Sequence, residues 1–350
     1  VWPQEGHIDI AGLPITERIP PLDRATRTVD SSHTSFQWTG MLSVWRWSCV
    51  SLLTTAAGLL VRDVEEFAVR GSFSKTCALY PNQRIVVVTV NYEYVDFFVN
   101  WLHFAKDYLR DTERLVVYAE DSAAVPALNQ VLAGSDVHFT VVSPNALVSP
   151  KSRNRGTSLL DVNINVGAPY GTQEYGEVVW RRPLHLLTLL RRGCTVLYVD
   201  IDTVWAKDPF LDIGQKPGHD MYLVEDDAEK KRPDWTYFCS CFLYLQPKPA
   251  VRQLLSLWSD FMNGNKNQHV FNRVLVALKG AVDFAVLPME KYPPGPVSHK
   301  YPSATVVHAN WVNGHDAKVC FMQRRGVWSE TRGQNETSCE DPLPFKKDKM

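Results

Sequence analysis

The pattern of apolar and polar positions divides the chain into three stretches. Residues 1 to about 50 are rich in Pro, Ser, Thr and charge and show no sustained period, which is typical of a stem or arm. Apolar residues at helical spacing follow over 51–70, with Gly71 as a stop. We therefore expect an N-terminal arm with one helix over 1–75, one folded domain over 76–330 and a polar, disordered tail over 331–350.

Within the folded stretch, β-branched runs alternate with segments of helical period. Strands are expected at 84–90, 115–119, 137–142, 196–202, 221–224, 238–245, 283–287 and 305–308. Helices are expected at 96–109, 125–132, 178–191, 250–262 and 268–278. This alternation predicts an α/β fold with a mostly parallel central sheet flanked by helices. Residues 143–173 show no period and predict a long loop over one sheet edge.

Composition narrows the class of protein. Hydrophobic residues make up 45% and charged residues 21% of the 350 positions, which are ordinary globular values. A net charge of -1 argues against broad nucleic-acid binding, because phosphate neutralisation needs clustered Lys and Arg. The apolar stretch 41–61 contains Arg46 and falls short of the roughly 20 residues that span a bilayer, so we expect a packed helix there. A poorly formed N-terminal membrane anchor is the alternative.

The cysteines give little evidence of a metal or disulfide framework. Seven cysteines are few for a chain of this length, and an odd number leaves at least one unpaired. The Cys239-x-Cys241 spacing does not match a zinc knuckle, so structural zinc is not expected. The sequon Asn335-Glu336-Thr337 would be glycosylated if the chain enters the secretory pathway.

The strongest chemical signal is Asp200-Ile201-Asp202, which directly follows an apolar strand. If the strand continues through the triplet, both carboxylates project to one side and can hold a divalent cation. Such a cation can act as Lewis acid for a departing nucleoside diphosphate, as in enzymes that use nucleotide-activated sugars. The alternative is a surface turn without metal, since Asp-x-Asp triplets are common there.

Other predicted strands also end in polar side chains. In open parallel sheets these ends meet at one edge, where ligands bind. The groups are Thr89 and Asn91, Glu120 and Asp121, Asp226 and Asp227 after Glu225, and His308. An imidazole beside two carboxylates suits Mn²⁺ better than Mg²⁺, so His308 is the candidate third ligand.

Several blocks in one order resemble a known family. They are 180–190, 197–210, 239–247, 267–272 and 308–328, within a similarity that runs in register from about Ser51 to Trp328. The chain resembles the nucleotide-diphospho-sugar transferases that include the plant rhamnogalacturonan II xylosyltransferases. The resemblance implies a glycosyltransferase A-type (Rossmann-like) fold, a nucleotide-sugar donor, a divalent metal and retention of anomeric configuration.

The resemblance also implies residue roles. Asp202 would bind the metal directly, Asp200 would contact the ribose or bind metal through water, and His308 would be the remaining protein ligand. Lys318, which follows Gly314, would reach the diphosphate and stabilise the leaving group.

Four further sets of residues are assigned, two of them with an alternative left open. Arg181 or Arg182 would also reach the diphosphate, or lie on a solvated helix face, and Thr89 and Asn91 would contact the nucleotide. Cys239 and Cys241 share one strand face and match the family, so we expect a structural role for them. The aromatic side chains either stack on sugar rings or fill the core, the candidates being Tyr94, Trp101, Trp235 and Trp311.

Retention requires a carboxylate nucleophile or same-face attack guided by the leaving diphosphate, and the sequence leaves both open. Asp226 and Asp227 are the candidate carboxylates facing the sugar, with a solvated acidic turn as the alternative. The family has Asp-Gln where this chain has Asn267-Gln268, which weakens any proposal of a carboxylate at 267. Gln268 stays a candidate, because an amide can orient a sugar hydroxyl or stabilise the oxocarbenium-like centre by its carbonyl dipole.

We therefore predict a metal-dependent retaining glycosyltransferase that moves a sugar from UDP-xylose or another UDP-sugar to a glycan acceptor in the Golgi lumen. One alternative is a haloacid dehalogenase type phosphohydrolase, because Asp200-Ile201-Asp202-Thr203-Val204 also fits its signature. Against it, several predicted elements precede Asp200, whereas that signature normally begins its domain. The other alternative is a nucleotide-sugar-binding module without turnover.

Overall fold

The computed structural model describes residues 84–109, 113–143, 173–227, 236–262 and 267–329, together with Cys339. All of them belong to one compact unit, Arg62–Pro342. The arm expected over 1–75, most of the loop expected over 143–173 and all but one residue of the tail lie outside the described residues. The domain boundaries therefore stay predictions.

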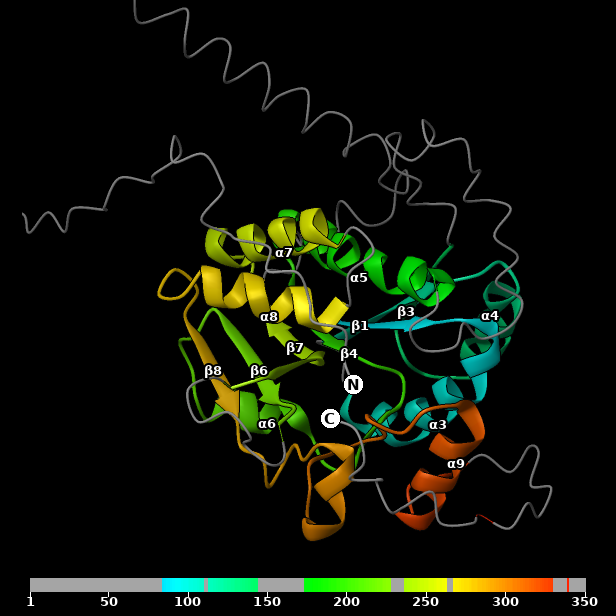
Figure 1. Ribbon diagram of the computed structural model, residues 1–350. Helices are drawn as coiled ribbons and strands as arrows, with labels where there is room; N and C mark the ends of the chain where they lie inside the picture. The colour runs from blue at the N-terminus through cyan, green and yellow to red at the C-terminus, as the bar shows by residue number, and fades with distance from the viewer. Residues whose placement is uncertain are drawn as a thin grey trace, which may run out of the picture. The chain divides into compact units, whose positions relative to one another are not determined.

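The described part is built on a twisted sheet with the strand order β3-β2-β1-β4-β7-β6-β8, beside a two-stranded sheet of β5 and β9 (Figure 1). The strands are β1 (Arg84–Val90), β2 (Glu113–Ala119), β3 (Phe139–Val142), β4 (Thr195–Val199), β5 (Thr203–Trp205), β6 (Met221–Glu225), β7 (Phe238–Leu245), β8 (Phe284–Leu287) and β9 (Val306–His308). Strand β7 runs antiparallel to both β4 and β6, whereas the other pairs in the large sheet are parallel. The predicted α/β class with a mostly parallel sheet is confirmed.

Helices cover both faces of this sheet. They are α3 (Val95–Ala105), α4 (Ala124–Ala133), α5 (Gln173–Arg191), α6 (Pro209–Gly214), α7 (Pro249–Phe261), α8 (Asn267–Ala277) and α9 (His315–Arg324). Helices α5, α7 and α8 lie on one face, and α3 and α6 lie on the other (Figure 1). Strand β1 shows why both faces are covered: Ile85 and Val87 pack with the first group of helices, whereas Val86 and Val88 pack with the second.

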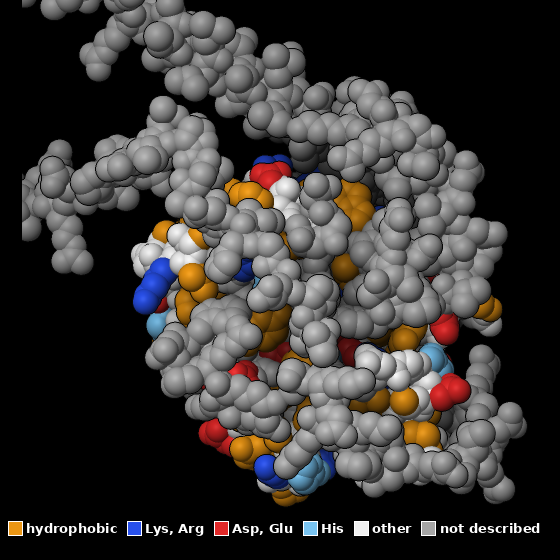
Figure 2. Space-filling model, in the orientation of Figure 1, with side chains coloured by type: hydrophobic (Ala, Val, Ile, Leu, Met, Phe, Trp, Pro, Cys, Tyr) orange, Lys and Arg blue, Asp and Glu red, His pale blue; other side chains and the backbone are white. Residues whose placement is uncertain are grey.

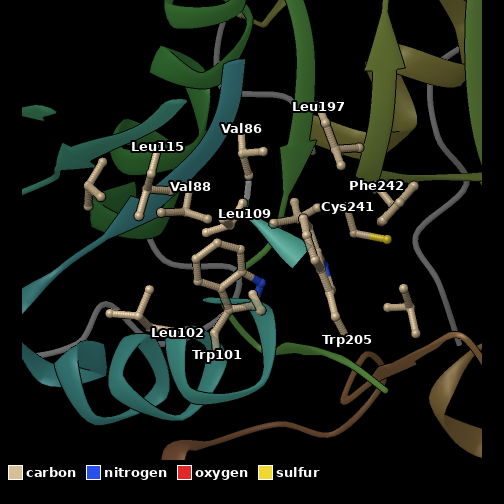
Figure 3. Packing of buried hydrophobic residues seen from close by; sticks show 14 of the residues in the cluster. Val86, Val88, Trp101, Leu102, Leu109, Leu115, Leu197, Trp205, Cys241 and Phe242 are labelled. Atoms are coloured by element: carbon tan, nitrogen blue, oxygen red, sulfur yellow. The ribbon is translucent and has the colours of Figure 1, made fainter. Parts of the chain in front are cut away.

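The second of these cores contains two tryptophans that hold the small sheet against α3. The rings of Trp101 on α3 and Trp205 on β5 meet edge to face with centroids 5.4 Å apart, and both side chains are fully buried (Figure 3). Trp101 is therefore a core residue, and its predicted alternative role in stacking on a sugar is wrong. Trp235 lies outside the described residues.

Two short helices and one strand direction were not predicted. Helix α6 begins with Pro209 after Asp208, whose Oδ1 accepts a hydrogen bond from the Phe210 amide at 2.9 Å. Helix α9 begins after Gly314, whose φ of 91° is a backbone conformation that favours glycine. The reversal of β7 leaves no mark in its apolar pattern, because this strand is buried on both faces.

Where described residues are visible in Figure 2, Lys and Arg side chains occur at separate places beside acidic and hydrophobic side chains. In the described part of the chain, no helix has the length and apolarity needed to cross a membrane.

Candidate active site

The Asp-x-Asp triplet forms a turn between two strands. Strand β4 ends at Val199, and the amide and hydroxyl of Thr203 donate to the carbonyl oxygen of Asp200 at 3.2 and 2.7 Å. The expectation that the strand continues through Asp202, with both carboxylates on one face by alternation, is therefore wrong. The turn nevertheless directs both carboxylates to the same place.

The small sheet brings His308 to this turn. Thr203 on β5 pairs with His308 on β9, and the amide of Ala309 donates to the carbonyl oxygen of Asp202 at 3.0 Å. One ligand atom each from Asp200, Asp202 and His308 lie within 4.8 Å of one another. Two carboxylates and one imidazole form a donor set that suits a divalent cation such as Mn²⁺, so the predicted residues fit the predicted metal.

Lys318 lies beside the same carboxylate. Its ammonium donates to Asp202 Oδ2, and His308 Nε2 lies 3.2 Å from Asp202 Oδ1. Burial alone would raise the pKa of Asp202, but the Lys318 charge and the His308 contact outweigh it and hold that pKa below its ordinary value. Lys318 is placed by α9, whose first turn follows the positive φ of Gly314. The structure thus brings the predicted diphosphate lysine to the candidate metal-binding carboxylates.

A second possible ligand group shares His308 but lacks suitable donors. Cys239, Cys241 and His308 also have ligand atoms within 4.8 Å of one another. However, Cys239 and Cys241 are joined in a disulfide, which leaves no thiolate for a metal. The structural role expected for these cysteines agrees with this disulfide, and the aspartates form the better metal site.

The two arginines of α5 take different positions. Arg182 Nη2 lies 2.8 Å from Asp200 Oδ1, and its Nη1 donates to the carbonyl and hydroxyl oxygens of Ser240 at 3.2 Å each. Arg181 instead faces Glu120, with its Nη1 3.5 Å from Glu120 Oε2. Only Arg182 therefore joins the cluster around the aspartate turn.

Residues at the end of β1 reach this cluster indirectly. The hydroxyl groups of Thr89 and Tyr198 lie 3.4 Å apart, and the Tyr198 hydroxyl donates to Asp200 Oδ1 at 2.6 Å. Asn91 is half-buried at the same sheet edge, directly after β1. Asp121 accepts hydrogen bonds from the backbone amides of Tyr92 and Ala124. Its carboxylate therefore stabilises the start of α4 and is not directed at a ligand.

A second carboxylate cluster forms around Asp226, after β6. Gln268 Nε2 donates to Asp226 Oδ2 at 2.6 Å, Trp311 Nε1 donates to Oδ1 at 3.0 Å, and Asn310 Nδ2 also donates to Oδ1. Burial raises the pKa of Asp226, although these hydrogen bonds and the nearby His308 partly oppose the shift. Among the described residues, Asp227 lies outside this cluster. Asp226 and Gln268 come together as candidates, and Asp227 does not.

Three members of the site were not assigned by the sequence analysis. Tyr198 lies two residues before Asp200, Ser240 lies between the two strand cysteines, and Asn310 lies two residues after His308. Each is a polar group close to a motif, and that proximity is the signal that could have found them.

The family model described as nucleotide-diphospho-sugar transferase matches residues 112–322, which is more than half of the chain. The chain belongs to this family. As a nucleotide-diphospho-sugar transferase it is a glycosyltransferase, so the phosphohydrolase alternative is wrong. The α/β sheet and the family together agree with the predicted glycosyltransferase A-type fold.

Two relatives of this transferase are named for their activities. UDP-D-xylose:L-fucose alpha-1,3-D-xylosyltransferase 1 of Arabidopsis thaliana is 27% identical over 277 residues, covering 71% of each chain. UDP-galactose:fucoside alpha-3-galactosyltransferase of Dictyostelium discoideum is 22% identical over 212 residues, covering 56% of this chain and 31% of the relative.

Among solved structures, the galactosyltransferase LgtC, in complex with donor and acceptor sugar analogs, superposes with a TM-score of 0.43 at 15% identity. The match covers 71% of this chain and 98% of LgtC. A likeness this loose assigns no residue role.

Proposed function

We propose that this transferase moves xylose from UDP-xylose to a fucose-containing glycan, with a divalent metal, preferably Mn²⁺, and with retention of configuration. The observation that carries the metal proposal is the convergence of Asp200, Asp202 and His308 from a turn and a paired strand. When bound there, the metal supplies Lewis-acid stabilisation for the leaving diphosphate. The ammonium of Lys318 adds positive charge at the same place.

The relatives support the choice of substrates. Both names give a fucose or fucoside acceptor and an alpha linkage to position 3, whereas the donors differ between xylose and galactose. Fucose is therefore the better supported acceptor. UDP-xylose is the preferred donor because the xylosyltransferase match covers more of the chain. Since both UDP-sugars are α-anomers, an alpha product means retention.

In the proposed reaction, the bond from the anomeric carbon to the diphosphate oxygen breaks and a bond to an acceptor hydroxyl oxygen forms. In the same-face alternative, the leaving diphosphate takes the proton of that hydroxyl. In the covalent alternative, a carboxylate first attacks the anomeric carbon and displaces the diphosphate. The acceptor hydroxyl oxygen then displaces the carboxylate, and its proton passes to the diphosphate. Asp226 is the candidate carboxylate because it is buried near the candidate metal ligand His308. Gln268 orients this carboxylate through its 2.6 Å hydrogen bond.

We assign the nucleotide to the same edge of the sheet. We assign Asp200 to the ribose or to a water-mediated metal contact, and Thr89 and Asn91 to the nucleotide at the end of β1. Arg182 orients Asp200 through their 2.8 Å ion pair. A guanidinium held on two sides keeps the carboxylate in one orientation, which is the property that a shared metal and ribose ligand needs.

A secretory location is part of the proposal. The disulfides Cys239–Cys241 and Cys320–Cys339 support an oxidising compartment, for which we propose the Golgi lumen. A glycan on Asn335 and a membrane anchor formed by an N-terminal segment are parts of the same proposal. Removal of N-glycans with a glycosidase, followed by a mobility shift on a gel, tests the first of these.

The activity is tested with purified protein, UDP-xylose, UDP-galactose, UDP-glucose and GDP-sugars, with methyl α-L-fucoside as acceptor, in Mn²⁺ or with chelator. We expect UDP release and an alpha-linked product from UDP-xylose with Mn²⁺, and loss of turnover in chelator and in Asp202→Asn. Asp212→Asn is the matched control, because Asp212 is equally buried and paired with Lys291. Full activity of Asp202→Asn without metal would refute the site, and no turnover of any donor would favour a binding module.

A further inference from the structure

One exposed aromatic side chain, that of Trp311, is hydrogen-bonded to the site. Trp311 is 53% exposed, whereas Trp101, Trp205 and Trp258 are fully buried. Exposure of a single apolar residue needs no explanation by itself. Two other observations, the backbone conformation of Trp311 and its hydrogen bond, indicate that this exposed ring has a function.

The backbone at Trp311 adopts an unfavourable conformation. Its φ is 65°, and among the described residues it is the one non-glycine with a positive φ. A bulky side chain in this region is strained, and such strain persists where the surrounding structure or a function requires it. Glycine or asparagine would fit the turn better, so the turn itself does not explain a tryptophan here.

The surrounding contacts fix the ring in one place. Trp311 Nε1 donates to Asp226 Oδ1 at 3.0 Å, and the neighbouring Asn310 donates to the same oxygen. Asn310 is held in turn by the amide of Gly295, where an added Cβ would lie 2.4 Å from the Asn310 carbonyl oxygen. The N–H edge of the indole is therefore attached to the candidate catalytic carboxylate while half of the side chain stays exposed.

Burial separates this ring from the donor side of the site. Asp202 and His308 are 7% and 8% exposed, whereas Trp311, only three residues after His308, is half exposed. A substrate that binds over the donor must enter from the exposed side. Trp311 is therefore placed to contact the acceptor, which is the second substrate to arrive.

We propose that the indole face of Trp311 is the acceptor subsite, on which the apolar face of a pyranose stacks. This inference rests on the proposed transfer to a glycan. The C–H bonds on one face of a sugar ring carry slight positive charge and are attracted to the electron-rich face of an indole. Stacking there would direct an acceptor hydroxyl toward Asp226, because Asp226 holds the edge of the same ring.

The test compares Trp311→Leu, which removes the ring, with Trp311→Phe, which keeps an aromatic face but loses the N–H. Kinetics with UDP-xylose and methyl α-L-fucoside should show a roughly tenfold higher acceptor KM for Trp311→Leu and less than a threefold rise for Trp311→Phe. The donor Kd should stay within about twofold of wild type in both. Phe261→Leu, at an exposed aromatic residue on α7, is the control.

Three outcomes would overturn the inference while leaving the transferase activity intact. One is an unchanged acceptor KM in Trp311→Leu. Another is an equal decrease of kcat in Trp311→Leu and Trp311→Phe, which would make Trp311 a positioning residue for Asp226. The third is a rise in donor Kd of the same size as the rise in acceptor KM.

A measurement without turnover separates this inference from the proposed reaction. Saturation-transfer NMR of methyl α-L-fucoside with the wild-type protein, UDP and Mn²⁺ should show contact with the sugar ring. The signal should persist in Trp311→Phe and disappear in Trp311→Leu. Equal signals in both variants, or no signal with the wild-type protein, would overturn the proposal.

Discussion

Asn267 Nδ2 donates a hydrogen bond to the carbonyl oxygen of Val179 at 2.7 Å, so this side chain joins the start of α8 to α5. The side-chain Oδ1 of Asn267 accepts a hydrogen bond from the Ser240 hydroxyl at 3.0 Å. The backbone carbonyl oxygen of Asn267 accepts one from Trp258 Nε1 at 3.0 Å. The side chain needs one donor and one acceptor, which an amide provides and a carboxylate does not. The departure from the Asp-Gln pattern at 267 therefore has a structural reason in this chain.

We predict that Asn267→Asp lowers the free energy of unfolding by about 1–3 kcal/mol at pH 7, because a buried carboxylate would face the carbonyl of Val179. Urea denaturation followed by tryptophan fluorescence measures this change. The loss should shrink at low pH, where the protonated carboxyl regains a donor. Equal stability of the two proteins at pH 7 would show that the Val179 contact contributes nothing.

The two arginines of α5 should differ in their effect on catalysis. Arg182→Lys cannot contact Asp200 and both Ser240 oxygens in the same planar geometry, so we expect kcat/KM for the donor to fall roughly tenfold or more. Arg181 faces Glu120 instead of Asp200, so Arg181→Lys should change kcat/KM by less than about threefold. Steady-state kinetics with UDP-xylose measures both. Similar losses in the two variants would contradict the assignment of Arg182 to Asp200.

Several residues show which parts of this structure the sequence could predict. The strands and long helices follow from periodicity, because residues such as Ile85 and Val86 must bury opposite faces of one strand. The meeting of Asp202 with His308 was predicted from strand ends and from the family resemblance. Its geometry was not, since it depends on the pairing of two three-residue strands that carry little pattern of their own.

The sequence did not show which of two adjacent, similar side chains makes a distant contact. Adjacent arginines on one helix look alike in the sequence, and only tertiary packing sends Arg182 to Asp200 and Arg181 to Glu120. The same holds for Asp226 and Asp227, because the strand end alone does not say which carboxylate receives the hydrogen bonds of Gln268 and Trp311.

Replacing Lys318 should have opposite effects on the affinity for the metal and on the affinity for the nucleotide. Its ammonium donates to Asp202, so it competes with a cation for that carboxylate. In Lys318→Ala we expect Mn²⁺ alone to bind as tightly as in wild type or tighter. UDP in the presence of Mn²⁺ should bind roughly 10- to 100-fold more weakly, because a charge-assisted contact to the diphosphate is lost. Isothermal titration calorimetry measures both affinities, and weaker binding of Mn²⁺ alone would contradict the competition.

The stability of the start of α9 should depend on pH through the protonation of His315. His315 Nε2 lies 2.8 Å from Asp96 Oδ2 on α3, and His315 Nδ1 lies 3.1 Å from Asp316 Oδ1. The hydrogen bond to Asp96 raises the pKa of His315 to about 9 against the opposing effect of burial, and Asp316 adds to the rise. The protonated imidazole thus ties the helix that carries Lys318 to α3.

Because this pKa is raised above its unfolded value, the stabilisation is fully present below about pH 6.5 and is lost as pH rises through about 9. We expect wild type to exceed His315→Gln by about 1–2 kcal/mol in free energy of unfolding at pH 6, and the difference to vanish above pH 9. Urea unfolding of both proteins at pH 6, 7.5 and 9.5 measures the difference. A gap that stays constant over this range would mean that the His315 charge does not contribute. Asp96→Asn should lower the stability at pH 6 by a similar amount, because it removes the main partner of the same charge.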